Sequence, residues 1–272
     1  MPKIEDWQKR VAWIVSGVLG VVILAVAGFL FWGTTSFDDY VIFAVLAVVF
    51  APTVLNLIDY QWRKSIDERL PDLFRAIVQA QQTGMTLPQA IEEASKRDYG
   101  PLTKELKRLV SQMSWGSSFE EALDSFTERV GTTLVKRVVP LIIEASRSGG
   151  HVEKVFDPIG KFIQITLTLD KERKAQTRPY VAIIYVAFFV FLFTIVLLFK
   201  SFFAPISENA SMLGTVMLSQ DAARRLFFHM TAFQAFFSGL AAGKMGEGNI
   251  TSGLKHSIIL LTCGYLIFRI ML

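Results

Sequence analysis

The residues that catalysis would require are few and poorly spaced in this chain of 272 residues. A phosphate-binding P-loop needs Gly-x-x-x-x-Gly-Lys followed by Ser or Thr, and Gly243-Lys244-Met245 offers neither the hydroxyl nor the upstream glycine. His151 and Glu153 have the spacing of a deaminase fragment, but the paired cysteines that would hold zinc are absent, because Cys263 is the single cysteine. We therefore expect no enzyme, no catalytic residue, no metal site and no cofactor.

Long uncharged runs dominate the rest of the chain. Residues 180–199 carry no charge, and a helix of about 20 apolar residues crosses the ~30 Å hydrocarbon layer of a membrane. Residues 11–32 and 41–58 form two further runs, and residues 226–243 and 257–268 form two that are shorter or interrupted by polar side chains. The sequence therefore predicts an all-α, polytopic membrane protein with about five transmembrane helices.

The flanking charges orient these spans. The basic residues Lys171, Arg173, Lys174 and Arg178 precede the span at 180–199, and such residues are held on the cytoplasmic side. The connection at 33–40 has two acids and no base, so we expect it outside the cell membrane. We predict three parts: a two-span hairpin at 1–58, a cytoplasmic bundle at 59–178, and a membrane domain of about three spans at 179–272.

The block at 59–178 reads as a folded helical domain. Its 19 Lys or Arg residues nearly balance its 17 Asp or Glu residues, which suits a solvated domain better than a nucleic-acid-binding tail. Apolar residues recur at helical spacing, and capping-box spacings mark helix starts at Thr86-x-x-Gln89 and at Ser117-x-x-Glu120 or Ser118-x-x-Glu121. Glycines punctuate these stretches, so we expect about six helices in the bundle.

A repeat organises this block. Each copy begins with glycine and has apolar residues three, six and seven positions later, and the copies begin 32 and 33 residues apart. We interpret each copy as a helical hairpin whose turn needs a glycine in the left-handed conformation. The predicted structural turns are Gly84, Gly116, Gly149 and Gly150. A period close to 34 leaves a tetratricopeptide-like solenoid open as the alternative to a compact bundle.

These motifs resemble the type II secretion system F-domain family. The resemblance rests on the glycine-x-x-apolar repeat, the element Ser148-Gly149-Gly150, the basic segment and the run Arg178-Pro-Tyr180 that enters the membrane, and it covers roughly residues 65–272. The tail from Gly239 to Ser257 is similar to the archaeal branch of the family. Arg147 stands where bacterial relatives usually have a glutamate, which also favours the archaeal type.

The resemblance implies a non-enzymatic platform in the cell membrane. Such a protein couples a cytoplasmic hexameric secretion ATPase to extraction and polymerisation of pilin-like subunits, in an archaeal pilus, an archaellum or a Tad-like system. Because many bacterial members carry two copies of the soluble domain and this chain has one, we expect a homodimer or larger oligomer, or a requirement for a paralogue. The alternative from the residues alone is a small-solute transporter or channel with a regulatory bundle.

Several side chains are candidates for contact or packing roles. The candidate ATPase contacts are Lys136, Arg137, Arg147, Lys171, Arg173 and Lys174, although the last three equally suit a topology signal. Gly239 and Gly243 have the spacing that lets two helix backbones approach closely. His229, Gln234 and His256 suit either a polar path through the membrane or, more simply, hydrogen bonds between helices.

Overall fold

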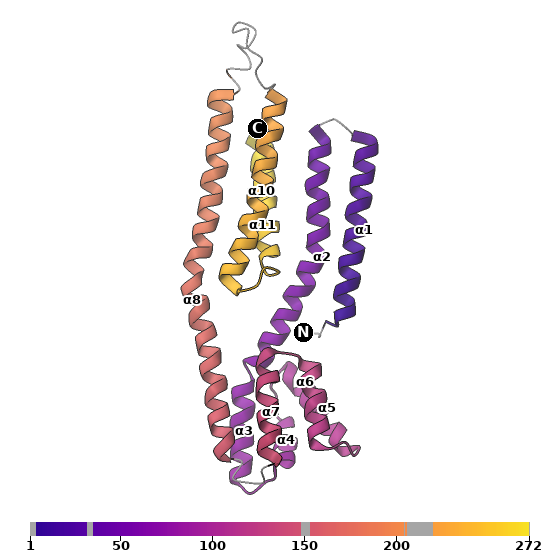
Figure 1. Cartoon of the computed structure of the whole chain (residues 1–272), viewed down its shortest axis with the longest axis vertical. Coiled ribbons are helices and arrows are strands. Elements are labelled where there is room, and N and C mark those ends of the chain that lie inside the picture. The colour runs from indigo at the N-terminus through magenta and orange to yellow at the C-terminus, as the bar shows by residue number, and fades with distance from the viewer. Residues whose placement is uncertain (1–3, 32–34, 148–152, 204, 206–219, 272) are drawn as a thin grey trace. The chain divides into compact units, whose positions relative to one another are not determined.

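A computed structural model describes residues 4–31, 35–147, 153–203, 205 and 220–271, and these residues are almost entirely helical (Figure 1). None of them belongs to a strand, so the predicted all-α class is confirmed. Two compact units can be separated. We call residues 58–173 the bundle unit, and residues 4–57 together with 174–272 the membrane unit. Helices α2 (Thr35–Asp67) and α8 (Glu153–Leu198) contribute residues to both units.

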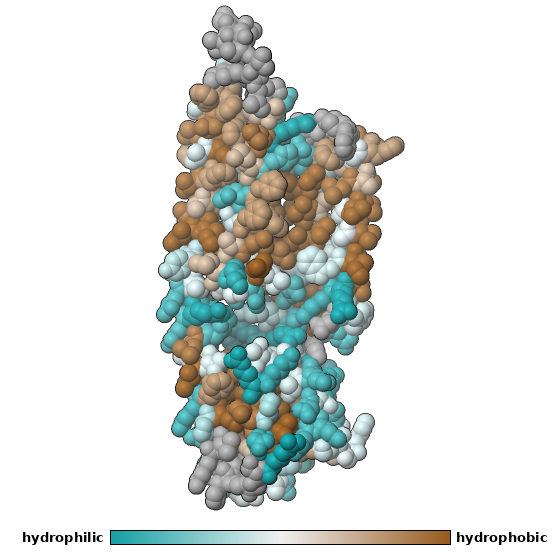
Figure 2. Space-filling view, in the orientation of Figure 1, coloured by the Kyte–Doolittle hydropathy of each residue, from teal (hydrophilic) through white to brown (hydrophobic). Residues whose placement is uncertain are grey.

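Five helices have the length and composition to cross a membrane, as the sequence predicted. They are α1 (Asp6–Phe31), the apolar parts of α2 and α8, α10 (Gln220–Glu247) and α11 (Gly253–Met271). A short π-helical segment, η1 (Phe199–Phe203), follows α8 directly. Apolar side chains cover most of the visible surface of the membrane unit in Figure 2. This protein is therefore a multi-pass membrane protein.

Five helices lie wholly within the bundle unit: α3 (Leu70–Gln82), α4 (Leu87–Ser95), α5 (Pro101–Ser114), α6 (Phe119–Val130) and α7 (Thr133–Arg147). The end of α2 and the first part of α8 join them around one contiguous apolar core. Phe74 of α3 stacks on Phe156 of α8 with ring centroids 5.6 Å apart. This contact between early and late helices indicates a compact bundle, because solenoid repeats contact only their neighbours.

Local chemistry sets the helix boundaries in the bundle unit. Gly84 and Gly116 have φ of +89° and +96° between consecutive helices, a conformation that residues with a Cβ rarely adopt. At the start of α6, the Ser118 side chain accepts from the Glu121 amide at 3.2 Å, and the Glu121 carboxylate accepts from the Ser118 amide at 3.1 Å. The helix therefore uses the second of the two serines. The predicted turn at Gly149 and Gly150 lies outside the described residues.

A buried carboxylate joins α5 to α6. Glu105 is 3% exposed, and its two oxygens accept from Arg108 Nη1 at 3.0 Å and from Arg129 Nε at 3.1 Å. Arg129 also donates to Gln112 Oε1 at 3.1 Å. Removing one partner of such a pair leaves an uncompensated charge in the core, so this network specifies how α5 and α6 pack.

A second polar link ties the end of α2 to the turn between α6 and α7. Arg63 donates to the Gly131 carbonyl at 2.8 Å and to Asp59 Oδ2 at 3.0 Å. One turn further along α2, Asp67 Oδ1 accepts from the Thr132 hydroxyl at 2.7 Å. Thr132 in turn accepts from the amide of Val135 at the start of α7. Burial raises the pKa of Asp67 to about 6, although the Thr132 hydrogen bond and Arg63 oppose this shift.

In the membrane unit, α10 and α11 pack along a seam of small residues. A Cβ added at Gly239 would lie under 3.0 Å from the Ser257 backbone, and one added at Gly243 would lie equally close to the Gly253 backbone. Ser257 is fully buried, and its hydroxyl donates to the Phe236 carbonyl at 2.8 Å. The two glycines thus lie where the two backbones come into contact.

We predict that Asp67→Asn removes a pH-dependent penalty on folding. The folded pKa lies above the unfolded value of 3.8, so the wild type loses stability, on the order of 2 kcal/mol, as pH rises from about 4 to above 6. Asparagine keeps the acceptor for Thr132 without the charge. Thermal unfolding of the detergent-solubilised protein between pH 4 and pH 7.5 should therefore favour the variant increasingly as pH rises. Exposed Asp98→Asn is the control, and parallel curves for wild type and Asp67→Asn would contradict the assignment.

We also predict that Gly239→Ala and Gly243→Ala destabilise the membrane unit, whereas Gly17→Ala does not. A methyl group at either seam position meets backbone atoms that cannot move aside, and overpacking of this kind costs about 1–3 kcal/mol or more. A methyl group at Gly17 meets nothing within 4 Å. Thermal unfolding in detergent measures the difference, and equal midpoints for the three variants would rule out a tight seam.

Candidate functional site

Helix α7 presents a basic face on the bundle unit. Lys136 and Arg137 are exposed next to each other, and Leu141 lies one turn beyond Arg137 with 48% of its surface exposed. Residues of α7 that face inward, such as Val135 and Val138, are buried in the core and hold the helix in place. Neither cation forms an ion pair with the described part of the chain. The face therefore has two positive charges without an ion-pair partner among the described residues, and an apolar side chain lies beside them.

Arg147, the third candidate on α7, is already engaged. Its Nε donates to Glu120 Oε1 at 2.8 Å, and its Nη2 donates to the other carboxylate oxygen of the same residue. This bidentate pair connects the last turn of α7 to the first turn of α6. The hydrogen bonds from Arg147 lower the pKa of Glu120. A partner that binds Arg147 would have to compete with this contact.

The remaining three candidates lie on α8. Lys171 and Arg173 are exposed, Lys174 is half-buried, and Arg173 donates to Asp170 at 3.0 Å. They stand just before the apolar part of the helix. Their position along α8 suits basic residues at a membrane surface as well as it suits a contact with a protein partner. Both interpretations therefore remain predictions.

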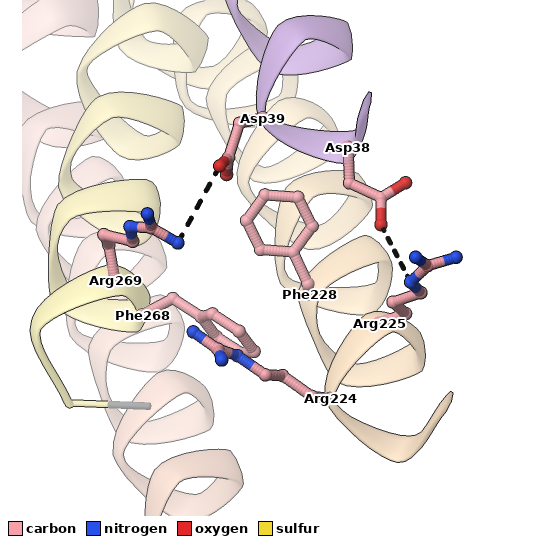
Figure 3. A pocket seen from close by; sticks show the side chains of 7 residues that line it. All are labelled: Asp38, Asp39, Arg224, Arg225, Phe228, Phe268 and Arg269. Carbon is pink, nitrogen blue, oxygen red and sulfur yellow. Dashed lines mark ion pairs between the residues drawn. The ribbon is translucent and has the colours of Figure 1, made fainter. Parts of the chain in front are cut away.

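The membrane unit contains a charged cluster that the sequence analysis did not single out (Figure 3). It lies where α2 and α10 begin and α11 ends. Asp38 of α2 faces Arg225 and His229 of α10, at 3.6 Å and 3.4 Å, and Asp39 lies 3.8 Å from Arg269 of α11. A small cleft is lined by both aspartates and by Arg224, Arg225, Phe228, Phe268 and Arg269. The ion pairs fasten the first membrane hairpin to the last two helices.

A sequence signal for this cluster existed. Arg224 and Arg225 lie in the first turns of α10, where the positive end of the helix dipole disfavours cations. Such a placement indicates acidic partners elsewhere, and the only acids of the 33–40 connection are Asp38 and Asp39. Arg224 makes no ion pair with the described residues, so the cleft keeps one surplus positive charge among them.

The polar residues of the spans form contacts between helices. Tyr185 Oη of α8 and His256 Nδ1 of α11 are 2.8 Å apart, and which atom donates depends on the histidine tautomer. His229 belongs to the charged cluster, and Gln234 is exposed on α10. The structure therefore does not bring these three residues together into one path. The described residues also contain no group of three or more side chains that could hold a metal ion.

Five helices long and apolar enough to cross a membrane, joined to a helical bundle with its own apolar core, define a polytopic membrane protein. The chain belongs to the family of the type II secretion system (T2SS) protein F, whose family model matches residues 64–199. That range contains the whole bundle from α3 onward and the α8 span. This match confirms the family expected from the sequence. Proteins of this family are membrane platform proteins.

The chain is also similar to an uncharacterised protein of Methanocaldococcus jannaschii, with 24% identity over 241 residues. The alignment covers 89% of this chain but 39% of that protein, so the chain spans about two fifths of its relative's length. No solved structure matches the chain significantly.

We predict that Glu120 and Arg147 act as a pair. Arg147→Glu or Glu120→Arg alone should lower the thermal unfolding midpoint because like charges then face each other, and the double exchange should recover most of the loss. The pKa of Glu120 is depressed, so the pair stabilises the fold above the ordinary value of 4.5 and loses its effect as pH falls through the lower folded value. Additive effects of the two single changes in a double-mutant cycle would show that the residues do not interact.

Proposed function

We propose that this protein is the membrane platform of a type IV pilus-like assembly machine, such as an archaeal pilus or an archaellum. It would couple a cytoplasmic hexameric secretion ATPase to the extraction and polymerisation of pilin-like subunits. The observation that carries the proposal is the match of the protein F family model to residues 64–199. The similarity to a protein from Methanocaldococcus jannaschii, an archaeon, supports an archaeal machine.

The proposal places the bundle unit in the cytoplasm. Four basic residues precede the apolar part of α8: Lys171, Arg173, Lys174 and Arg178. Cytoplasmic segments beside membrane spans carry an excess of such residues. The connection at 33–40, with its two acids, would then lie outside. This orientation puts the basic face of α7 on the side of the membrane where ATP is available to a partner enzyme.

Helix α8 gives the proposal a mechanical basis. It runs without interruption from Glu153 to Leu198, so the same hydrogen-bonded backbone belongs to the bundle core and to a membrane span. Phe156 and Ile163 of its first part are completely buried in the bundle core. A force applied to the bundle would therefore reach the span through a helix and not through a flexible linker. The spans, in turn, offer exposed apolar surface to the hydrophobic helices of pilin-like subunits.

The basic face of α7 is the proposed contact with the ATPase. Lys136 and Arg137 are exposed and have no ion-pair partner within the described residues, so an acidic partner surface would not have to displace an existing pair. Leu141 beside them can supply apolar contact, which distinguishes this face from an ordinary solvated surface. Arg147 is a weaker candidate because Glu120 already holds it.

We predict that reversing both charges, Lys136→Glu with Arg137→Glu, weakens capture of the cognate secretion ATPase about tenfold, because the acidic partner would then meet like charges. Lys104→Glu with Lys107→Glu, on the exposed side of α5, is the matched control for net charge. Capture by the full-length protein in detergent, measured at low and high salt, and fibre assembly in cells provide the two readouts. Equal ATPase capture by wild type and both variants would remove α7 from the contact, and assembled fibres in a deletion strain would refute the function itself.

A further inference from the structure

The cleft where α2 and α10 begin and α11 ends has a charged rim and an apolar floor (Figure 3). The floor consists of Phe228 and Phe268, which are 8% and 3% exposed and have ring centroids 5.3 Å apart. Both rings belong to one apolar cluster of the membrane unit. Charges beside such a floor are screened less than charges in open water, so they attract an oppositely charged ligand more strongly.

The rim carries more positive than negative charge. Three arginines and two aspartates line the cleft, so the lining residues have a net charge of +1. His229 lies near Asp38 but is not one of the lining residues. The start of α10 adds the positive end of a helix dipole beside the arginines. An anion bound in the cleft would balance both the surplus charge and the dipole.

Two of the arginines have hydrogen-bond donors that a ligand can use. Arg224 extends toward Phe268 in Figure 3 and makes no ion pair with the described residues. Arg269 Nη1 lies 3.8 Å from Asp39 Oδ2, which is beyond hydrogen-bonding range. Since a guanidinium has five N–H donors, both arginines can donate to the oxygen atoms of a bound anion.

We propose that this cleft binds a phosphate group. The planar forks of guanidinium groups match phosphate oxygens in both geometry and charge. The space available in the cleft, about 40 Å³, holds about three water molecules at roughly 10–15 Å³ each, which suits a single phosphate group. The surplus of one positive charge matches the single negative charge of a phosphodiester.

A membrane phospholipid and free phosphate are the two sources of such a group, and the surroundings favour the lipid. The exposed apolar surface of α10 begins one residue after the arginines of the cleft. Leu226, Met230 and Phe233 share one face of this helix and are 52%, 47% and 66% exposed. On α11, Ile270 follows Arg269 directly and is 81% exposed. A phospholipid whose tails lie along these side chains would have its phosphate at the level of the cleft.

The test measures binding to the full-length protein in dodecyl maltoside and a phosphate-free buffer. Three probes are added separately: dioleoyl phosphatidylglycerol, dioleoylglycerol, which has the same tails without the phosphate, and sodium phosphate. The rise of the thermal unfolding midpoint with probe concentration gives each apparent affinity. Arg224→Gln removes one arginine of the rim. Lys200→Gln is the matched control, because Lys200 is exposed and does not line the cleft.

We expect phosphatidylglycerol to raise the midpoint of the wild type far more than dioleoylglycerol does. Arg224→Gln should weaken the apparent affinity for phosphatidylglycerol at least tenfold, and Lys200→Gln should leave it unchanged. Asp39→Asn should instead tighten binding several-fold, because Asp39 competes with the anion for Arg269. A purely structural role of the cluster predicts no such gain. Stabilisation by sodium phosphate with the same dependence on Arg224 would also support the site, with free phosphate as its ligand.

Three results would overturn the proposal: equal stabilisation by phosphatidylglycerol and dioleoylglycerol, no response of the wild type to either phosphate compound, or equal affinities of the wild type and Arg224→Gln. If Arg224→Gln folds poorly, Asp39→Asn still decides the matter, because unchanged or weaker binding by that variant contradicts the proposal. The inference concerns the membrane unit alone and does not depend on the proposed ATPase contact.

Discussion

The side chains along helix α8 have to suit three environments in turn: a packed core, water and lipid. Its 46 residues extend over about 69 Å, so the helix is more than twice as long as one crossing of the ~30 Å hydrocarbon layer requires. The sequence changes its surface chemistry accordingly. Buried apolar residues come first, then a charged segment that includes Lys171 and Arg173, then an uncharged run from Tyr180 onward. The bundle unit and the membrane unit each include a different part of this helix.

The bundle unit uses buried charge to fix its geometry. Glu105 connects α5 with α6 through Arg129, and Asp67 connects α2 with Thr132 in the turn before α7. Apolar packing alone tolerates small slips between helices, whereas a buried carboxylate that loses its partner is costly. These links therefore fix how the helices of the bundle pack against one another.

Sequence reasoning identified features that are encoded locally. The spans follow from long apolar runs, and the bundle helices begin and end at capping residues and glycines such as Ser118, Gly84 and Gly116. Contacts between distant residues were not predictable, because they depend on how helices pack. The pair Glu120–Arg147 joins residues 27 positions apart, and Asp38 meets Arg225 from the other end of the chain. Even the choice between Ser117 and Ser118 required the structure.

The close seam between α10 and α11 has a consequence for biogenesis. These two helices are the least apolar of the five spans, and α10 contains Gln234 and Thr231. Such a segment partitions only weakly into lipid on its own during translocon-mediated insertion. A hairpin whose glycines allow backbone contact, and in which Ser257 donates to α10, can bury Thr231 and Ser257 between its helices before it leaves the translocon, while Gln234 stays exposed. Helices α10 and α11 would then insert into the membrane together, and α11 would cover the buried polar groups of α10.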